Sequence, residues 1–141
     1  MLDHLVRILP VTTIKDERGA LGIVELARSC GFSASRFYFL YDVRKPRGGH
    51  AHRRLRQCFI AFAGRAEITV DSGSERRTIV LDSPEQALII NPMVWRDLDM
   101  TPDTVLGVLA SEPYDEAEYI RDYETFTALA LERIGNDCPV R

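Results

Sequence analysis

Closely spaced turns constrain the fold of this chain more than any other feature of its sequence. Short runs rich in apolar, aromatic and β-branched residues are separated by turns rich in Gly, Pro, Asp and Ser, such as residues 71–74 and 82–84. Residues 35–43 alternate with a period of two, which is typical of a strand. About ten short strands at this spacing, without helices between them, predict an all-β sandwich or barrel.

The periodicity changes after Pro113. Residues 114–134 carry aromatic and aliphatic side chains at helical spacing, with acidic residues near the start, as a helix N-terminus prefers. We therefore predict one or two C-terminal α-helices that pack on the outside of the barrel. The chain has 141 residues and no internal repeat or linker, which favours a single domain over residues 1–141.

Composition excludes several classes of protein. A net charge of -3 argues against general nucleic-acid binding, which usually needs a basic surface. No apolar run reaches the length of a membrane span, and the first residues lack the pattern of a signal peptide. Three widely spaced cysteines, Cys30, Cys58 and Cys138, favour free thiols in a reducing compartment. We expect a cytoplasmic protein with no nucleic-acid or membrane partner.

The strongest chemical signal lies in residues 44–64. His50 and His52 follow a Gly-rich turn, and their spacing on a strand projects both imidazoles from one face. Such a pair is either half of a metal site or an acid/base pair. The neutral Gln57 is a weak ligand, and no histidine follows Pro92 to complete a metal site. Proton transfer is therefore favoured, since imidazole suits it near pH 7.

The same stretch resembles the first motif of the cupin superfamily. The motif has Gly-x-His-x-His, four residues, an acidic or amide residue, six residues and a glycine, which here is Gly64. Cupins are small jelly-roll barrels, and many bind a metal through two His, a Glu and a third His. The resemblance implies the jelly-roll barrel. It does not imply the metal, because Gln57 stands where the Glu would be.

Further segments resemble the dTDP-4-keto-6-deoxyglucose 3,4-ketoisomerases, which are WxcM-like sugar-nucleotide cupins. The similarity rests on Tyr38 and residues 47–52, 92–96 and 109–123, the last containing the unusual pattern S-E-x-Y-D-E-x-x-Y-I-R-D-Y. It implies that the chain shifts a keto group from C4 to C3 without metal or organic cofactor. It also implies a homodimer that exchanges N-terminal strands, and a 3-keto sugar product for transamination.

The resemblance also assigns roles in catalysis. His52 is the first choice as the base that removes the C3 proton, and His50 could shuttle the proton between the oxygens or hold the second oxygen. Tyr38 could donate to O4 or relay a proton, because its counterpart in the family is an active-site residue; the alternative is a plain barrel aromatic. The substrate-binding candidates are polar or aromatic residues that could grip the diphosphate, the sugar or the base: Arg18, Arg36, Arg47, Gln57, Trp95, Arg96 and Arg121.

Some alternatives stay open at this point. Trp95 could wall the ligand pocket or pack in the core. Arg18 and Arg96 are candidate determinants of the face on which C4 is reprotonated, and they do not settle whether the product is galacto- or gluco-configured. The competing functions are a dTDP-sugar 3,5-epimerase, a non-catalytic sugar-nucleotide-binding cupin and a metal-dependent dioxygenase.

Overall fold

The computed structural model describes residues 2–137, with side chains described up to Arg133, so Cys138 lies outside the described residues. Two five-stranded antiparallel sheets face each other. One sheet has the order β1 (Val6–Pro10), β9 (Gln86–Ile90), β6 (Gln57–Ala63), β11 (Val105–Ala110) and β4 (Arg36–Leu40). The other has the order β12 (Tyr119–Ile120), β5 (Arg47–His52), β10 (Trp95–Met100), β7 (Ala66–Asp71) and β8 (Arg76–Leu81). The predicted all-β class is confirmed.

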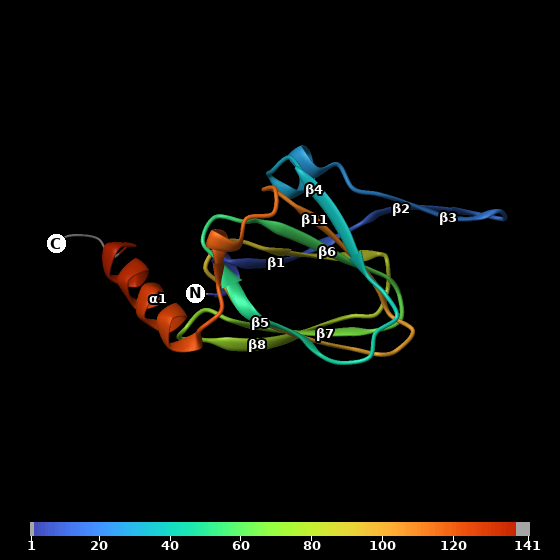
Figure 1. Ribbon diagram of the computed structural model, residues 1–141. Coiled ribbons are helices and arrows are strands. Elements are labelled where there is room, and N and C mark those ends of the chain that lie inside the picture. The colour runs from blue at the N-terminus through green and yellow to red at the C-terminus, as the bar shows by residue number, and fades with distance from the viewer. Residues whose placement is uncertain (1, 138–141) are drawn as a thin grey trace.

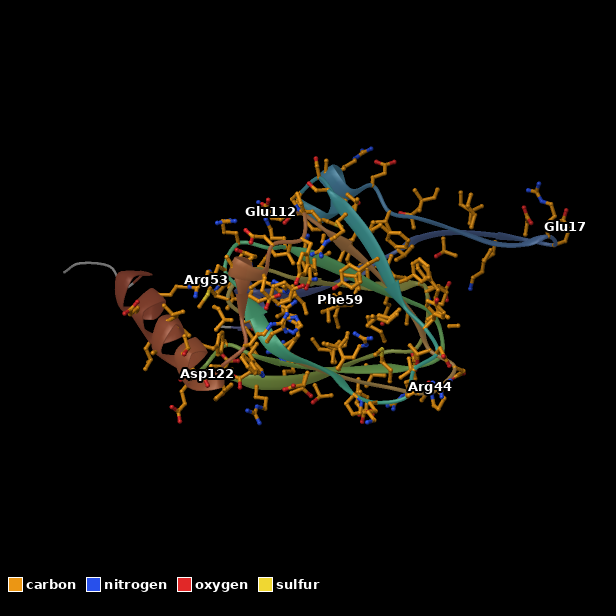
Figure 2. All side chains as sticks on the ribbon, viewed as in Figure 1. Glu17, Arg44, Arg53, Phe59, Glu112 and Asp122 are labelled. Atoms are coloured by element: carbon orange, nitrogen blue, oxygen red, sulfur yellow. The ribbon has the colours of Figure 1, made fainter. Side chains whose placement is uncertain are left out.

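The main core lies between the two sheets. Strand alternation turns one face of each strand inward, and this face carries Leu, Ile, Val and Phe side chains that are almost fully buried. Figure 2 shows Phe59 of β6 pointing into this interior. Burying each such side chain contributes about 1.5–3 kcal/mol, so the core holds the sheets firmly enough to position a site between them.

A hairpin of β2 (Thr12–Asp16) and β3 (Gly19–Ile23) forms a separate two-stranded sheet and projects away from the barrel (Figure 1). Ile14 and Leu21 on this hairpin are more than half exposed. A π-helical turn, Leu26–Cys30, follows the hairpin and leads to β4. A two-stranded hairpin with exposed apolar side chains is marginally stable by itself, so it is expected to gain from packing against another surface.

The C-terminal region differs from the prediction of helix from residue 114 onward. It begins with a 3₁₀ turn, Glu116–Glu118, and the short strand β12, which pairs Ile120 with Ala51 of β5. The α-helix, α1 (Tyr123–Asp137), starts only after Asp122, whose carboxylate accepts hydrogen bonds from the backbone and side chain of Thr125. Pairing with the free edge of β5 and capping by Asp122 therefore decide the structure here, even though the preceding residues have helical periodicity.

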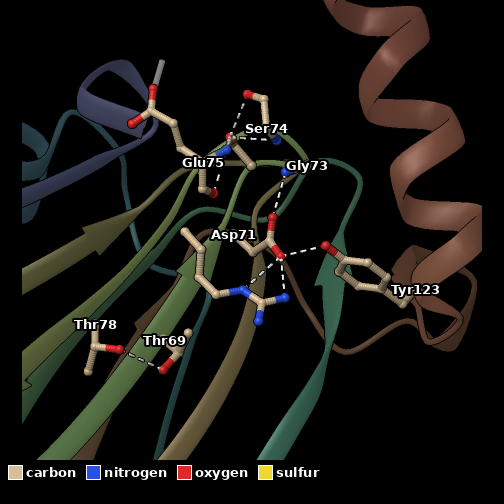
Figure 3. A network of polar contacts seen from close by, with 9 residues as sticks. Thr69, Asp71, Gly73, Ser74, Glu75, Thr78 and Tyr123 are labelled. Carbon is tan, nitrogen blue, oxygen red and sulfur yellow. Dashed lines mark hydrogen bonds and ion pairs between the residues drawn. The ribbon is translucent and has the colours of Figure 1, made fainter.

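The start of α1 is fastened to the turn between β7 and β8 (Figure 3). The buried Asp71 accepts hydrogen bonds from the Tyr123 hydroxyl at 2.6 Å, the Gly73 backbone at 2.7 Å and the Arg76 guanidinium at 3.0 Å. Burial alone would raise the pKa of Asp71, but these donors outweigh it and lower the pKa. A Cβ at Gly73 would lie 3.1 Å from Ala130, so the helix and the turn are in close contact.

The variant Tyr123→Phe is expected to be less stable by about 1.5–3 kcal/mol, because it removes a hydrogen bond to a buried carboxylate. Urea denaturation followed by circular dichroism measures this loss. The matched control is Tyr114→Phe, whose hydroxyl bonds to Glu116 at the surface and should contribute little. Equal stability of the two variants would show that the Asp71 contact does not anchor α1.

Candidate active site

A cavity of about 480 Å³ opens between the two sheets, and we call it the barrel cavity. Strands β4, β5, β6 and β10 contribute to its wall, together with the segment that precedes α1. Its lining is Arg36, Tyr38, Leu40, Arg47, Gly48, His50, Gln57, Phe59, Arg96, Leu98, Tyr114, Tyr119 and Arg121. Most of the residues that the sequence suggested for the site thus converge on one cavity.

The two histidines of β5 lie side by side at the cavity wall. Their ring centroids are 4.9 Å apart, and the rings are nearly perpendicular. His50 lines the cavity, whereas His52 lies beneath the wall with 1% of its surface exposed. A register shift between β5 and β10 occurs here, and Gly48 makes it possible because a Cβ at Gly48 would lie 2.7 Å from the Arg96 carbonyl oxygen.

Burial and positive charge hold both imidazoles neutral. Burial, followed by the charge of Arg96, lowers the pKa of His50 to about 4 and that of His52 to about 2. A neutral imidazole can accept a proton, so both rings are in the form that a general base requires at neutral pH.

Three polar side chains form a network across the cavity floor. The Gln57 amide donates to the Tyr38 hydroxyl at 2.9 Å, and its carbonyl oxygen accepts a hydrogen bond from Arg96. Arg96 also donates to the Val94 carbonyl at 2.9 Å, and its Nε has no hydrogen-bond partner. Gln57 therefore orients Tyr38 and Arg96. Burial raises the pKa of Tyr38, so its phenol stays protonated and able to donate.

Arg96 is the most unusual residue of the cavity. Only 1% of its surface is exposed, and the groups that accept its hydrogen bonds are neutral. Burial lowers its pKa to about 10, which still leaves it charged at neutral pH. An unpaired buried cation costs several kcal/mol, and this cost is commonly retained where an anionic ligand supplies the missing charge.

Three further arginines line the barrel cavity. Arg36 lies over the Tyr38 ring at 5.3 Å, and Arg121 lies over the Tyr119 ring at 4.3 Å. Arg121 also forms an ion pair of 2.6 Å with the exposed Glu116. Arg47 completes the set. Together with Arg96 they make the cavity strongly cationic, as a diphosphate-binding site requires.

Two predicted site residues lie elsewhere. Trp95 packs against Tyr123 and Phe126, with ring centroids 5.2 and 5.8 Å away. Because alternation on β10 turns Arg96 inward, it turns Trp95 outward toward α1, so the expectation that Trp95 walls the pocket gives way to the packing alternative. Arg18 sits in the turn of the projecting hairpin, paired with Asp16, and does not line the cavity of its own chain.

Tyr119 and Tyr114 were not predicted as site residues, yet both line the cavity. They belong to the segment that was predicted to be helical, where their inward direction could not be deduced. The signal that could have found them is the position of Tyr119 in the unusual tail pattern between Glu118 and Arg121.

The low histidine pKa values predict a pH profile. The imidazoles stay largely deprotonated as the pH falls from 7 toward 4, where His50 is half protonated. We therefore expect the acid limb of kcat/KM near pH 4, well below the ordinary imidazole value of about 6.5. Initial rates between pH 3.5 and 9 measure this limb, with thermal unfolding at each pH as the control for folding. An acid limb near 6.5 would contradict the predicted environment of the histidines.

Among residues 2–133, whose side chains the structure describes, no group of three or more His, Cys, Asp or Glu side chains is placed to hold a metal ion. Helix α1 and the shorter helical turns, taken over residues 2–137, are not long and apolar enough to cross a membrane. Cys30 and Cys58 are buried free thiols.

A two-sheet antiparallel barrel with paired histidines at the wall of a cationic cavity defines a cupin-type protein suited to an anionic ligand and to proton transfer. The model of the family FdtA (WxcM-like, C-terminal) matches residues 4–130, and the chain belongs to this family.

Relatives of this chain carry specific names. It is 37% identical over 123 residues to a TDP-4-oxo-6-deoxy-alpha-D-glucose-3,4-oxoisomerase from Aneurinibacillus thermoaerophilus, over 85% of this chain and 88% of the relative. It is 36% identical to QdtA, a sugar 3,4-ketoisomerase from Thermoanaerobacterium thermosaccharolyticum solved with TDP, with a TM-score of 0.90 over 94% of this chain and 98% of QdtA.

A histidine-to-asparagine variant of QdtA has been solved with TDP-4-keto-6-deoxyglucose. This chain is 34% identical to it, with a TM-score of 0.88 over 92% of this chain and 96% of the variant. These likenesses confirm the predicted family and the cupin-like fold.

Proposed function

We propose that this protein is an isomerase that moves the keto group of dTDP-4-keto-6-deoxyglucose from C4 to C3, giving a dTDP-3-keto-6-deoxyhexose for conversion to a 3-amino sugar. The observation that carries the proposal is the pair of neutral imidazoles, His50 and His52, at the wall of a cavity that also holds the buried cation Arg96. Membership of the family, and relatives named as ketoisomerases of this sugar nucleotide, support it.

The chemistry requires a base and donors for negative charge. The C4 ketone acidifies the proton on C3, and His52 removes it to give an enediolate. A proton is then delivered to C4 while O3 becomes the new ketone, so the reaction is balanced without an oxidant or reductant. His50 shuttles protons between the positions, while Tyr38 and Arg96 stabilise the charge on the enediolate oxygens. No step of this route needs a metal ion.

The diphosphate of the substrate would bind to the arginines that line the cavity. Guanidinium groups form paired hydrogen bonds with phosphate oxygens, and Arg36, Arg47 and Arg121 lie in the wall of the same cavity as His50. Arg121 would exchange its surface pair with Glu116 for a phosphate oxygen.

The test is incubation with dTDP-4-keto-6-deoxyglucose and a 3-aminotransferase, with chelator present. A 3-amino sugar product is expected, and loss of activity on chelation would refute the metal-free route. A 3,5-epimerase would instead exchange deuterium from solvent at C5 as well as C3. A non-catalytic binding protein would bind dTDP and exchange neither proton.

We also propose that the protein is a homodimer with exchanged N-terminal strands. The projecting β2–β3 hairpin and the exposed outer face of the edge strand β4, where Phe37 and Phe39 are 53% and 52% exposed, are apolar surfaces that a second copy would cover. Arg18 would then reach the cavity of the other subunit. A reducing cytoplasm, which the free thiols Cys30 and Cys58 favour, is the proposed location.

The exchange can be tested by unfolding and refolding together Arg18→Ala and His52→Asn, which should each be inactive alone if Arg18 serves the partner's cavity. If Arg18 serves the partner's cavity, each hybrid dimer contains one cavity with both residues intact, and activity returns. Without exchange, Arg18 reaches no cavity, so Arg18→Ala should keep its activity and mixing it with His52→Asn should add none. Light scattering on the separate variants serves as the control that each one is dimeric.

A further inference from the structure

His52 lacks the polar partner that usually orients a catalytic histidine. In most acid/base sites one ring nitrogen is held by a carboxylate or a backbone carbonyl, which fixes the tautomer and the direction of the ring. Both ring nitrogens of His52 are buried, and neither has a hydrogen-bond partner among the described residues. His50 differs, because the Gly48 backbone lies within hydrogen-bonding reach of its ring and favours the protonated form, which raises the pKa of His50 against the effect of burial.

What His52 contacts instead is the ring of Tyr119. The two ring centroids are 4.5 Å apart at an angle of 62°, and the Tyr119 ring also lies 5.1 Å from that of His50. The contact follows from the sheet, because Tyr119 of β12 stands directly opposite His52 of β5. Opposed side chains on neighbouring strands are close enough to pack, and edge-to-face aromatic pairs have a preferred geometry.

The Tyr119 ring is itself held in place. The Arg121 guanidinium lies over it at 4.3 Å and pairs with the exposed Glu116. On the other side of Tyr119 in the chain, the buried carboxylate of Glu118 accepts hydrogen bonds from the backbone of Arg54 and Leu55, just after the histidine strand. The short β12 segment is therefore tied to β5 through backbone pairing, a carboxylate and a ring.

We propose that Tyr119 is a positioning residue that orients the His52 imidazole toward the barrel cavity, performing by ring packing the task that a carboxylate performs in other sites. This inference rests on the proposed function, because it assigns His52 as the base. The Tyr119 hydroxyl is not required for this role, whereas its ring is.

The kinetic test compares Tyr119→Phe with Tyr119→Leu. The phenylalanine variant keeps the ring and should keep kcat within about twofold of the original protein. The leucine variant removes it, and kcat should fall roughly 100-fold with little change in KM, because small misplacement of a reacting group has effects of that size. Equal losses in both variants would overturn the proposal in favour of a chemical role for the hydroxyl. An unchanged kcat in the leucine variant would overturn it outright.

A second readout does not depend on turnover. Histidine labelled with ¹⁵N in the ring reports the tautomer and pKa of His52 in the free protein. The charged or titratable groups that act on His52 are Arg96, His50, Arg36 and Arg121, and they are unchanged in the variants. Loss of the Tyr119 ring admits water, so the pKa of His52 should rise from about 2 toward the ordinary value and the ring should populate both tautomers.

The comparison variant is Tyr114→Leu, which removes a ring of the same cavity that packs against Tyr119, with ring centroids 5.9 Å apart, rather than against His52. It should leave the His52 resonances and their pKa in place. If the Tyr119→Leu spectrum matches that of the original protein, the positioning role is refuted even though the protein is folded. If the original protein does not turn over the keto sugar, the proposed function fails, while the spectra still decide whether Tyr119 orients His52.

Discussion

Replacing His52 with asparagine is expected to lower kcat by roughly a thousandfold while dTDP affinity stays nearly unchanged. Asparagine keeps a polar side chain of similar reach but cannot accept a proton, so the loss is that of the general base. Affinity should survive because dTDP lacks the keto sugar on which His52 acts, and the arginines that would bind the diphosphate line the cavity. Turnover of the keto sugar and calorimetric titration with dTDP measure the two effects.

His50→Asn is the matched control, because it changes the other imidazole of the same strand. If His50 shuttles protons, its loss should slow turnover but leave exchange of the C3 proton with deuterated water measurable. The His52 variant should lose that exchange together with turnover. Retained exchange in the His52 variant and its loss in the His50 variant would reverse the two roles.

The sequence allowed much of this site to be predicted because strands place alternate residues on one face. His50 with His52 and Arg36 with Tyr38 each share a face, and all but His52 line the barrel cavity. Alternation alone does not show which face of a strand points into the barrel. On β4 the more apolar face, with Phe37 and Phe39, points outward and is half exposed, because the polar face of this strand borders a cavity.

The differences between the predicted and observed positions have physical causes of the same kind. Trp95 precedes an inward arginine on the same strand, so its side chain had to point outward, but only the position of α1 shows what it packs against. The position of Tyr119 does not follow from the sequence, because residues 114–122 have helical periodicity and the pairing of Tyr119–Ile120 with the edge of β5 is a contact distant in sequence. Local propensity could not reveal that the tail completes the sheet that carries the histidines.

Arg96 is the residue for which activity and stability should change in opposite directions. The variant Arg96→Met removes a buried charge whose acceptors are neutral, so thermal stability should be equal or higher. It also removes the buried cation that we propose stabilises the enediolate, and kcat should fall by roughly 100- to 1000-fold. Differential scanning calorimetry and turnover assays on the same preparation measure both quantities.

The variant Arg96→Lys separates charge from shape. Lysine keeps the positive charge but lacks the planar fork that bonds Gln57 and the Val94 carbonyl, so it should recover part of the activity that methionine loses.

The histidines provide an internal check, because the Arg96 charge is, after burial, the largest cause of their low pKa values. In the methionine variant those pKa values should rise, moving the acid limb of kcat/KM upward from pH 4, whereas the lysine variant should leave the limb near its original position. A methionine variant that unfolds more easily and keeps its acid limb near pH 4 would mean that Arg96 stabilises the barrel and does not stabilise negative charge on the reacting sugar.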